Sequence, residues 1–351
     1  MKPTALVVGS TGISGQNLAD HLVHHGWTVH GLARRPGTHR GIVPVVADLA
    51  DPASVRHALE GQAFSHVYYC TWARQANEAE NIRVNGAMLR NLLEALPACP
   101  EHVALVTGLK HYLGPFESYG KVKPDTPFSE EQPRVPYPNF YYAQEDILFE
   151  AAARQGFRWS VHRPHTLIGW ALGNAMNMGV TLAVYAALCR ETGRPFVFPG
   201  SPQQYEALTD VTDARILARH LEWASTEPQA GNQALNIVNG DVFRWRRMWG
   251  KLARALGVEA AEYPGHAQPL EAMWADAAPL WDKVVTKHNL QPFALETLVS
   301  WWHTDADLGR PLETLTDMTK NRRLGFRDVQ VTEDSFLDLF ARLRAEKIIP
   351  G

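Results

Sequence analysis

The segment GSTGISG, residues 9–15, constrains the fold of this chain more than any other feature of its sequence. It follows a continuous apolar run over 5–8, typical of a strand buried on both faces, and precedes a helical pattern that carries Leu18 and Leu22. In such a unit the first glycine allows a tight turn, the second lets the backbone approach a pyrophosphate, and the third lets helix and strand pack closely. The N–H groups and dipole of the helix N-terminus favour the same anion. The segment therefore predicts a nucleotide-binding turn, and a glycine-rich turn without a ligand is the alternative.

Strands and helices alternate along the first half of the chain. The strands are predicted at 5–8, 28–32, 42–46, 66–70, 103–106 and 159–162, the helices after the first at about 52–59, 81–96 and 139–155, and a loop rich in proline and glycine at 114–138. This alternation predicts an α/β fold, a Rossmann-type doubly wound parallel sheet, whose ligand crevice lies at the carboxyl ends of the strands.

The pattern becomes mostly helical after Pro164. We expect residues 1–165 to form the nucleotide-binding domain, to which 209–240, with a strand at 235–238, returns. Residues 166–208 and 241–351 are then a smaller, mostly helical lobe that covers the crevice and binds the substrate. A chain of 351 residues is long enough for two such lobes, at about 150 residues per domain.

Charge and apolar content exclude several classes of partner. The chain has 34 Lys and Arg against 37 Asp and Glu, a net charge of −3, so it offers no basic field for nucleic acid or for an anionic membrane. Its longest apolar stretch, 178–189, is too short to span a bilayer, and the N-terminus resembles no export signal. The three cysteines are too few for a disulfide framework, and we expect reduced thiols in a cytoplasmic protein.

Two arginines follow the second predicted strand, where an NAD site would have an acidic residue for the ribose 2′-hydroxyl. Arg34 and Arg35 suit a 2′-phosphate, because guanidinium groups bind phosphate through two parallel hydrogen bonds; a solvated basic turn is the alternative. After the third strand, Asp48 and Leu49 would bracket the adenine, and Asp48 is equally well explained as the cap of a helix at Pro52. Together these features favour NADP(H) as the cofactor.

The motif Tyr-x-x-x-Lys, usual in reductases of this broad class, is absent. In the segment YYAQED, residues 141–146, Glu145 and Asp146 stand four residues after the two tyrosines. The catalytic lysine must therefore come from elsewhere. Lys110, in the segment TGLKHY at 107–112, is the candidate because it follows the fifth predicted strand at the crevice. A surface lysine at the end of a strand is the alternative.

These segments together resemble one atypical branch of the extended short-chain dehydrogenases/reductases, the enone 1,4-reductases that include progesterone 5β-reductase and iridoid synthase. The resemblance extends over nearly the whole chain and rests on several motifs in the same order. They are CTWA at 70–73, TGLKHYLGP at 107–115, GPFESYG at 114–120, NFYYAQED at 139–146, SVHRP at 160–164, NIVNGD at 236–241 and LGF at 324–326.

The resemblance implies roles for individual residues. The catalytic lysine of the branch falls on Lys110 and its catalytic tyrosine, the second of the pair, on Tyr142, while core packing is the favoured interpretation of Tyr141. The residues expected to touch the cofactor are Gly9, Thr11, Gly12, Ile13, Gly15, Arg34, Arg35, Asp48, Leu49, Thr71, Trp72, Thr107, Tyr142, His165, Thr166 and Leu167. Those expected to touch the substrate are Phe116, Tyr142, Met176 and Asn177.

Such an enzyme reduces the C=C bond of an α,β-unsaturated carbonyl compound, because hydride from NADPH adds to the β-carbon and leaves an enolate. The growing charge on oxygen needs a preorganised donor. Tyr142 would supply it, and Lys110 would hold a ribose hydroxyl and lower the pKa of the tyrosine. A small apolar enone or enal, steroid- or monoterpenoid-like, is the expected substrate. No metal site is expected, since His162 and His165 point to opposite faces of a strand.

Two other functions stay open. One is an NADP-dependent carbonyl reductase, or a sugar epimerase or dehydratase, of the extended short-chain type; the absence of Tyr-x-x-x-Lys argues against it. The other is a non-catalytic protein that senses NADP(H), which would tend to lack the tyrosine and the lysine. The sequence also leaves open whether the protein is a homodimer.

Overall fold

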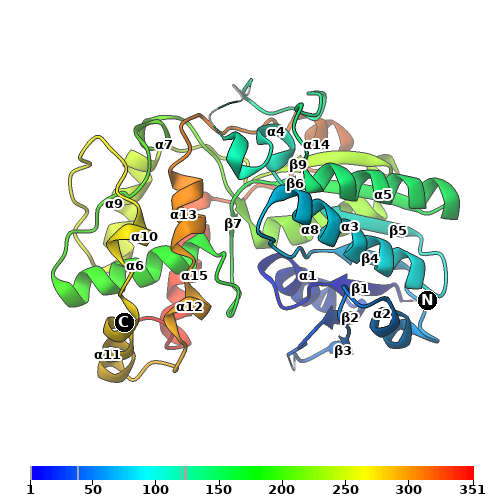
Figure 1. Ribbon diagram of the computed structural model, residues 1–351, viewed down its shortest axis with the longest axis horizontal. Coiled ribbons are helices and arrows are strands. Elements are labelled where there is room, and N and C mark those ends of the chain that lie inside the picture. Colours follow the sequence, from blue (N-terminus) through cyan, green and yellow to red (C-terminus); the bar gives the residue numbers. More distant parts are fainter. Residues whose placement is uncertain (1, 38, 120, 122–124) are drawn as a thin grey trace.

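A parallel sheet of seven strands forms the centre of the computed structural model, which describes residues 2–37, 39–119, 121 and 125–351 (Figure 1). The strand order is β3-β2-β1-β4-β5-β6-β9, and every neighbouring pair is parallel. The strands are β1 (Thr4–Val8), β2 (Thr28–Ala33), β3 (Ile42–Val46), β4 (His66–Tyr69), β5 (His102–Val106), β6 (Arg158–Pro164) and β9 (Gln233–Ile237). The predicted doubly wound α/β sheet is confirmed, and its order reverses between β1 and β4, where such folds bind their ligands.

Helices cover both faces of the sheet, and the alternating side chains of β1 show why. Ala5 and Val7 join the core on the face of α1 and α8, whereas Leu6 and Val8 join the core on the face of α2, α3 and α5. The helices are α1 (Ile13–His24), α8 (Ala214–Thr226), α2 (Pro52–Leu59), α3 (Glu78–Ala95) and α5 (Phe140–Gln155). The apolar run over 5–8 is therefore buried on both faces of the sheet.

The helical lobe is built around α6 (Met178–Thr192), which holds the apolar stretch seen in the sequence. Every residue of 178–189 is buried, because the other helices of the lobe pack around it in one hydrophobic core. They are α7 (Pro202–Glu206), α9 (Trp245–Leu256), α10 (Leu270–Met273), α11 (Ala278–His288), α12 (Leu295–Leu298), α13 (Trp301–Leu308) and α15 (Thr332–Ala345). In the part of the chain that the structure describes, no helix has the length and apolar character needed to cross a membrane.

Several short elements lie outside the sheet and the longer helices. The strands β7 (Leu167–Ile168) and β8 (Thr212–Asp213) form a parallel pair, and Figure 1 shows β7 between the sheet and the lobe. The others are α4 (Lys110–Leu113), η1 (Phe116–Ser118), η2 (Pro228–Ala230) and α14 (Thr319–Leu324). Within 241–351, which we expected to belong to the lobe, α14 packs against β9, and Met318 and Phe326 join the core beside α1 and α8.

Candidate active site

The glycine turn follows β1 and ends at the first residues of α1. Gly9 has a φ of +83°, and a Cβ there would lie 2.7 Å from the Cβ of Thr71. A Cβ on Gly15 would lie 2.2 Å from the carbonyl oxygen of Gly9, so this glycine lets α1 start directly against the turn. Gly12 is the N-cap of α1 and supplies no side-chain cap. The turn therefore leaves the positive end of the helix dipole exposed to an anion.

A cavity of about 530 Å³ lies at the carboxyl ends of β1, β4, β5 and β6. Each strand contributes the residues that follow it. The predicted cofactor residues that line the cavity are Gly9, Thr11, Gly12, Ile13, Thr71, Trp72, Thr107, His165, Thr166 and Leu167, together with the predicted catalytic Lys110 and the predicted substrate contact Met176. Gly15 packs against Gly9, behind the turn. The cavity therefore brings together most of the residues that the sequence predicts to touch the cofactor.

Besides Gly15 and Tyr142, four predicted cofactor residues lie outside this cavity. Arg34 and Arg35 are exposed directly after β2, next to the glycine turn, whose Gly9 N–H donates to the carbonyl of Leu32 at 2.8 Å. Asp48 is exposed and Leu49 is buried after the neighbouring strand β3. The helix cap considered for Asp48 belongs instead to Asp51, whose carboxylate accepts from the N–H of Ala53 at 2.9 Å.

The predicted substrate contact Asn177 lies away from the cavity. Asn177 is fully buried and caps α6: its side-chain oxygen accepts from Val180 N–H at 3.3 Å, and its amide donates to the carbonyl of Gly169 at 2.9 Å. It does not line the cavity, and its side chain joins the start of α6 to Gly169. Phe116 lies in η1, but its side chain is outside the described part of the structure, and so is its predicted contact.

The two adjacent tyrosines take the opposite orientations to those expected. Tyr141 lines the cavity, and a Cβ on Gly108 would lie 3.4 Å from its hydroxyl oxygen. Tyr142 does not line it: its hydroxyl donates to the carbonyl of His111 and accepts from the N–H of Val135 at 3.0 Å. Because neighbouring helical residues are about 100° apart, satisfying Tyr142 in this way turns Tyr141 toward the cavity. In this structure Tyr141, and not Tyr142, therefore faces the cavity.

Lys110 is buried beside aromatic rings. The residue is only 8% exposed, and its Nζ lies 5.2 Å from the ring centre of Trp72 and 5.1 Å from that of Phe140. Burial lowers the pKa of Lys110 to about 8, against the opposing charges of Glu78 and Glu117. Burial also raises the pKa of Tyr141, so the expected lowering of the catalytic tyrosine's pKa is not seen for the tyrosine in the cavity.

One wall of the cavity is polar, which the sequence analysis missed. His303 and Asp307 on α13, and Arg310 just after it, all line the cavity. Arg310 pairs with Asp307 and contacts the Nε2 of His165 at 2.7 Å, and the Nδ1 of His165 lies 2.8 Å from a carboxylate oxygen of Asp210. In the sequence, His303, Asp307 and Arg310 are separated by four and three residues, a spacing that puts side chains on one face of a helix. This spacing was the signal that could have identified them.

The comparisons with known proteins agree with this architecture. The model of the "NAD dependent epimerase/dehydratase family" matches residues 5–237. An (S)-8-oxocitronellyl enol synthase of Nepeta racemosa is 39% identical, over 99% of this chain and 93% of that protein. A 3-oxo-Δ(4,5)-steroid 5β-reductase of Arabidopsis thaliana is 38% identical over the same shares.

Solved structures share the fold at low identity. The Bordetella bronchiseptica enzyme WbmH, in complex with NAD+, has a TM-score of 0.67 at 15% identity and covers 98% of this chain and 99% of its own. A Thermus thermophilus UDP-glucose 4-epimerase with NAD has a TM-score of 0.65 at 16% identity, over 97% and 99% of the two chains. The chain belongs to the NAD dependent epimerase/dehydratase family, within the extended short-chain dehydrogenases/reductases, in the branch of the (S)-8-oxocitronellyl enol synthases and the steroid 5β-reductase.

Proposed function

We propose that this protein reduces the C=C bond of α,β-unsaturated carbonyl compounds with NADPH. The observation that carries the proposal is that one cavity is lined by the glycine turn, by Lys110 and by Tyr141. The Arabidopsis relative supports it, because its name describes a reductase of steroids with a double bond next to the C3 carbonyl, which is an enone.

The glycine turn fits a dinucleotide cofactor. The close approach of Gly15 to Gly9 places the uncapped N-terminus of α1 at the cavity, where it favours a pyrophosphate. We propose that Arg34 and Arg35, exposed beside the turn, hold the 2′-phosphate, with Asp48 and Leu49 at the edge of the adenine. When bound, NADPH supplies the hydride that adds to the β-carbon.

Tyr141 and Lys110 support the charge that develops on the substrate. Burial raises the pKa of Tyr141, so its hydroxyl keeps its proton and donates to the oxygen of the forming enolate. Lys110, with a pKa of about 8, is mainly cationic at neutral pH and favours the same negative charge. We assign it also to a ribose hydroxyl of the cofactor. Such fixed groups stabilise the transition state without reorganising during the reaction, and the α-carbon then takes a proton from water.

The competing functions fit this cavity less well. Glu145, four residues after Tyr141, is bound by Arg163 and Arg134 at 3.1 Å each. Burial raises the pKa of Glu145, but the hydrogen bond from His111 and the charge of Arg163 outweigh it and bring the pKa to about 2. This carboxylate stays ionised and replaces the lysine that a carbonyl reductase or epimerase of the usual type needs. A protein that only senses NADP(H) needs neither Tyr141 nor Lys110.

The polar wall on α13 refines the substrate that we propose. His303 lines the cavity, and its Nδ1 has no hydrogen-bond partner within the described part of the chain. A buried polar atom without a partner is costly, and a ligand that bonds to it removes the cost. We therefore propose a small enone or enal with an apolar body and a second hydrogen-bonding group that faces His303.

Two further points belong to this proposal. The three cysteines, Cys70, Cys99 and Cys189, are free, which supports a reducing compartment such as the cytoplasm. Besides the substrate, the other partner considered for this chain is a second copy of itself. Size-exclusion chromatography with light scattering would measure whether a homodimer forms.

The proposed function is tested by incubating the protein and NADPH with a cyclic enone and, separately, with the matching saturated ketone. We expect NADPH absorbance to fall with the enone only, and mass spectrometry to identify the saturated ketone as product. An alcohol as main product would favour the carbonyl reductase. Tight NADPH binding without oxidation across a panel of enones and enals would favour the sensor.

A further inference from the structure

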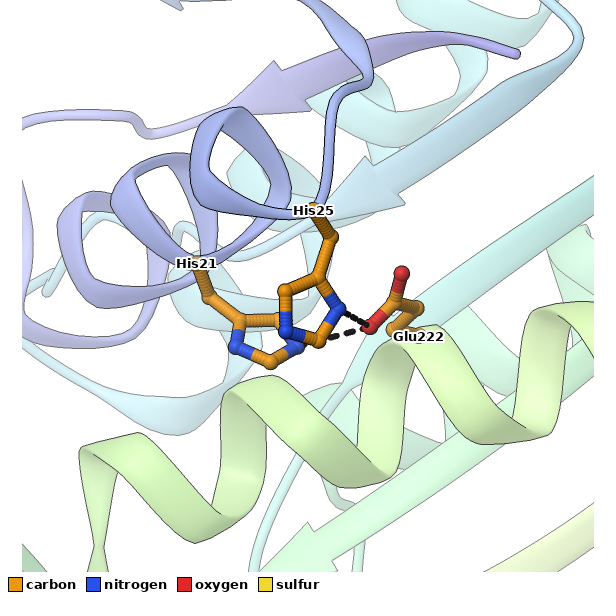
Figure 2. Close-up of side chains that lie close together, drawn as sticks. All are labelled: His21, His25 and Glu222. Atoms are coloured by element: carbon orange, nitrogen blue, oxygen red, sulfur yellow. Dashed lines mark hydrogen bonds and ion pairs between the residues drawn. The ribbon is translucent and has the colours of Figure 1, made fainter. Parts of the chain in front are cut away.

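A cluster of two histidines and one glutamate joins α1 to α8, at the end of α1 that is remote from the glycine turn (Figure 2). His21 lies in the last turns of α1, His25 is the C-cap of this helix, and Glu222 lies on α8. The Nε2 of His21 lies 2.7 Å, and the Nδ1 of His25 2.6 Å, from the same carboxylate oxygen of Glu222. The two ring centres are 4.0 Å apart. Three metal-ligating groups thus converge on one point.

We propose that His21, His25 and Glu222 bind a divalent transition-metal ion of the zinc type. Imidazole nitrogens and carboxylate oxygens are the usual ligands of such ions, and three protein ligands with one water complete a tetrahedral site. The three ligand atoms already lie within 4.8 Å of one another. Ligands of tetrahedral zinc are about 3.3 Å apart, so the nitrogen–oxygen distances need to open by only about 0.6 Å.

The spacing of the two histidines favours the same conclusion. Residues i and i+4 lie on one face of a helix, one above the other, so α1 presents His21 and His25 side by side. An ion at this point displaces the hydrogen atoms that the two rings share with Glu222. Each neutral ring then carries its proton on the other nitrogen, and the charge of the carboxylate offsets half of the charge of the ion.

The environment of Glu222 suits a charged ligand that is held in one orientation. The Nε1 of Trp27 donates to the second carboxylate oxygen at 2.8 Å, which fixes the carboxylate and leaves the first oxygen for the ion.

An ion in solution can reach the cluster. The side chain of His25 is 50% exposed, and those of His21 and Glu222 are 16% and 17% exposed. The 12 residues of α1 place the cluster about 18 Å from the start of the helix, so the ion takes no part in the reaction. It ties α1 to α8 only in the folded chain and therefore stabilises the folded state.

The test uses the full chain without an affinity tag, freed of metal with a chelator, and with the exposed thiol removed by Cys99→Ser in every variant. Zinc chloride is titrated by calorimetry, and thermal unfolding is followed with and without zinc. We expect one equivalent of zinc to bind and to raise the unfolding midpoint on the order of 2–4 °C. His25→Ala and Glu222→Gln should weaken zinc binding at least tenfold and abolish the shift.

His24→Ala is the matched control, because His24 is exposed on the same helix and its Nδ1 contacts the carbonyl of Asp20 instead of the cluster. This variant should bind zinc as the parent does. When cobalt(II) is added in place of zinc, it should also show the visible absorption of a tetrahedral cobalt site, which His25→Ala should lack. Equal zinc affinity in His25→Ala and His24→Ala, or no stoichiometric binding to the parent, overturns the proposal. Since His25 is half exposed, its replacement leaves the fold intact and the result interpretable.

Discussion

The hydroxyl of Tyr142 donates a hydrogen bond to the backbone carbonyl of His111, the residue that follows Lys110. Asn139 makes a second connection to the same segment, because its side-chain amide donates to the carbonyl of Lys110 at 2.6 Å while its oxygen caps α5. The start of α5 is thereby fixed to α4, and Tyr141 is held in the cavity that Lys110 also lines. In our proposal, this arrangement lets Tyr142 position the site and leaves Tyr141 to contact the ligands.

Replacement of each tyrosine by phenylalanine should separate these two roles. We expect Tyr141→Phe to lower kcat on an unactivated cyclic enone by about 10²–10³, because it removes a donor to the oxygen on which charge develops. Tyr142→Phe should keep near-normal turnover and lose about 1–3 kcal/mol of stability, because the N–H of Val135 and the carbonyl of His111 lose their partner. Steady-state kinetics and urea unfolding measure the two effects.

The reverse result would contradict the assignment. If Tyr142→Phe were inactive at normal stability while Tyr141→Phe stayed active, Tyr142 would be the donor. The start of α5 would then be rotated in solution relative to this structure. NADPH affinity serves as the control, since neither change touches the glycine turn.

Local patterns predicted the sheet and the cofactor turn, because a buried strand, a glycine turn and an amphipathic helix are each specified by neighbouring residues. The orientation of the tyrosines was not predictable in this way. It depends on Val135 and on His111, which is 31 residues from Tyr142 in the sequence, and a helical pattern does not tell which of two adjacent tyrosines finds such partners.

The polar wall and the metal cluster depend on still more distant residues. Arg310 meets His165 across 145 residues, and Glu222 meets His21 across 201. Each residue alone is an ordinary surface or helix residue by sequence. These residues are brought together only in the folded chain, where α13 lines the cavity and α8 packs against α1.

Arg34 and Arg35 should determine the preference for NADPH over NADH. We expect the double change to alanine to weaken NADPH binding by about 1.5–3 kcal/mol, the range for hydrogen bonds to charged groups, and to leave NADH binding unchanged. Fluorescence titration with both cofactors measures this. Arg56→Ala, an exposed arginine of α2, is the control and should alter neither affinity. An equal loss for both cofactors would rule out the 2′-phosphate assignment.

Lys110 should give the activity an alkaline limit. Burial lowers the pKa of Lys110 to about 8, and a lysine is cationic below its pKa, so kcat/KM should fall as the pH rises through about 8. Lys110→Met should have a lower activity that no longer changes over this range. Lys283→Met, an exposed lysine of α11, should keep the parent profile. A parent profile that is flat up to about pH 10 would show that the charge of Lys110 is not needed.

A buried chain of histidines should make the fold sensitive to acid. His102 contacts Ser160, Ser160 contacts His162, and His162 contacts His220, with separations of 2.8, 2.8 and 2.9 Å. Burial lowers the pKa of all three histidines, to about 3 for His102 and about 4 for His220. Between these values and the unfolded value of 6.5, the unfolded chain binds more protons, so stability falls as the pH falls.

The expected loss is about 1.4 kcal/mol per pH unit for each histidine that stays neutral in the folded state. Urea unfolding at several pH values between about 7 and 5 measures it. His220→Gln, which keeps a polar partner for Asn321, should reduce this dependence, and His24→Ala, an exposed control, should not. A His220→Gln variant with the full acid dependence of the parent would assign the effect to other groups.

His303 should decide which enones bind. Burial lowers the pKa of this histidine, so it is neutral at pH 7, and its partnerless Nδ1 belongs to a residue of the cavity wall. We expect His303→Phe to raise the KM for a cyclic enone with a hydroxyl or second carbonyl group by about 5–30-fold, which corresponds to about 1–2 kcal/mol. The KM for the same enone without that group should stay equal or fall, with kcat little changed, because the added ring is apolar. His266→Phe, an exposed histidine of the lobe, is the matched control. If both substrates respond alike to His303→Phe while both are still reduced at the C=C bond, the polar wall does not select the substrate and the reductase assignment stands without it.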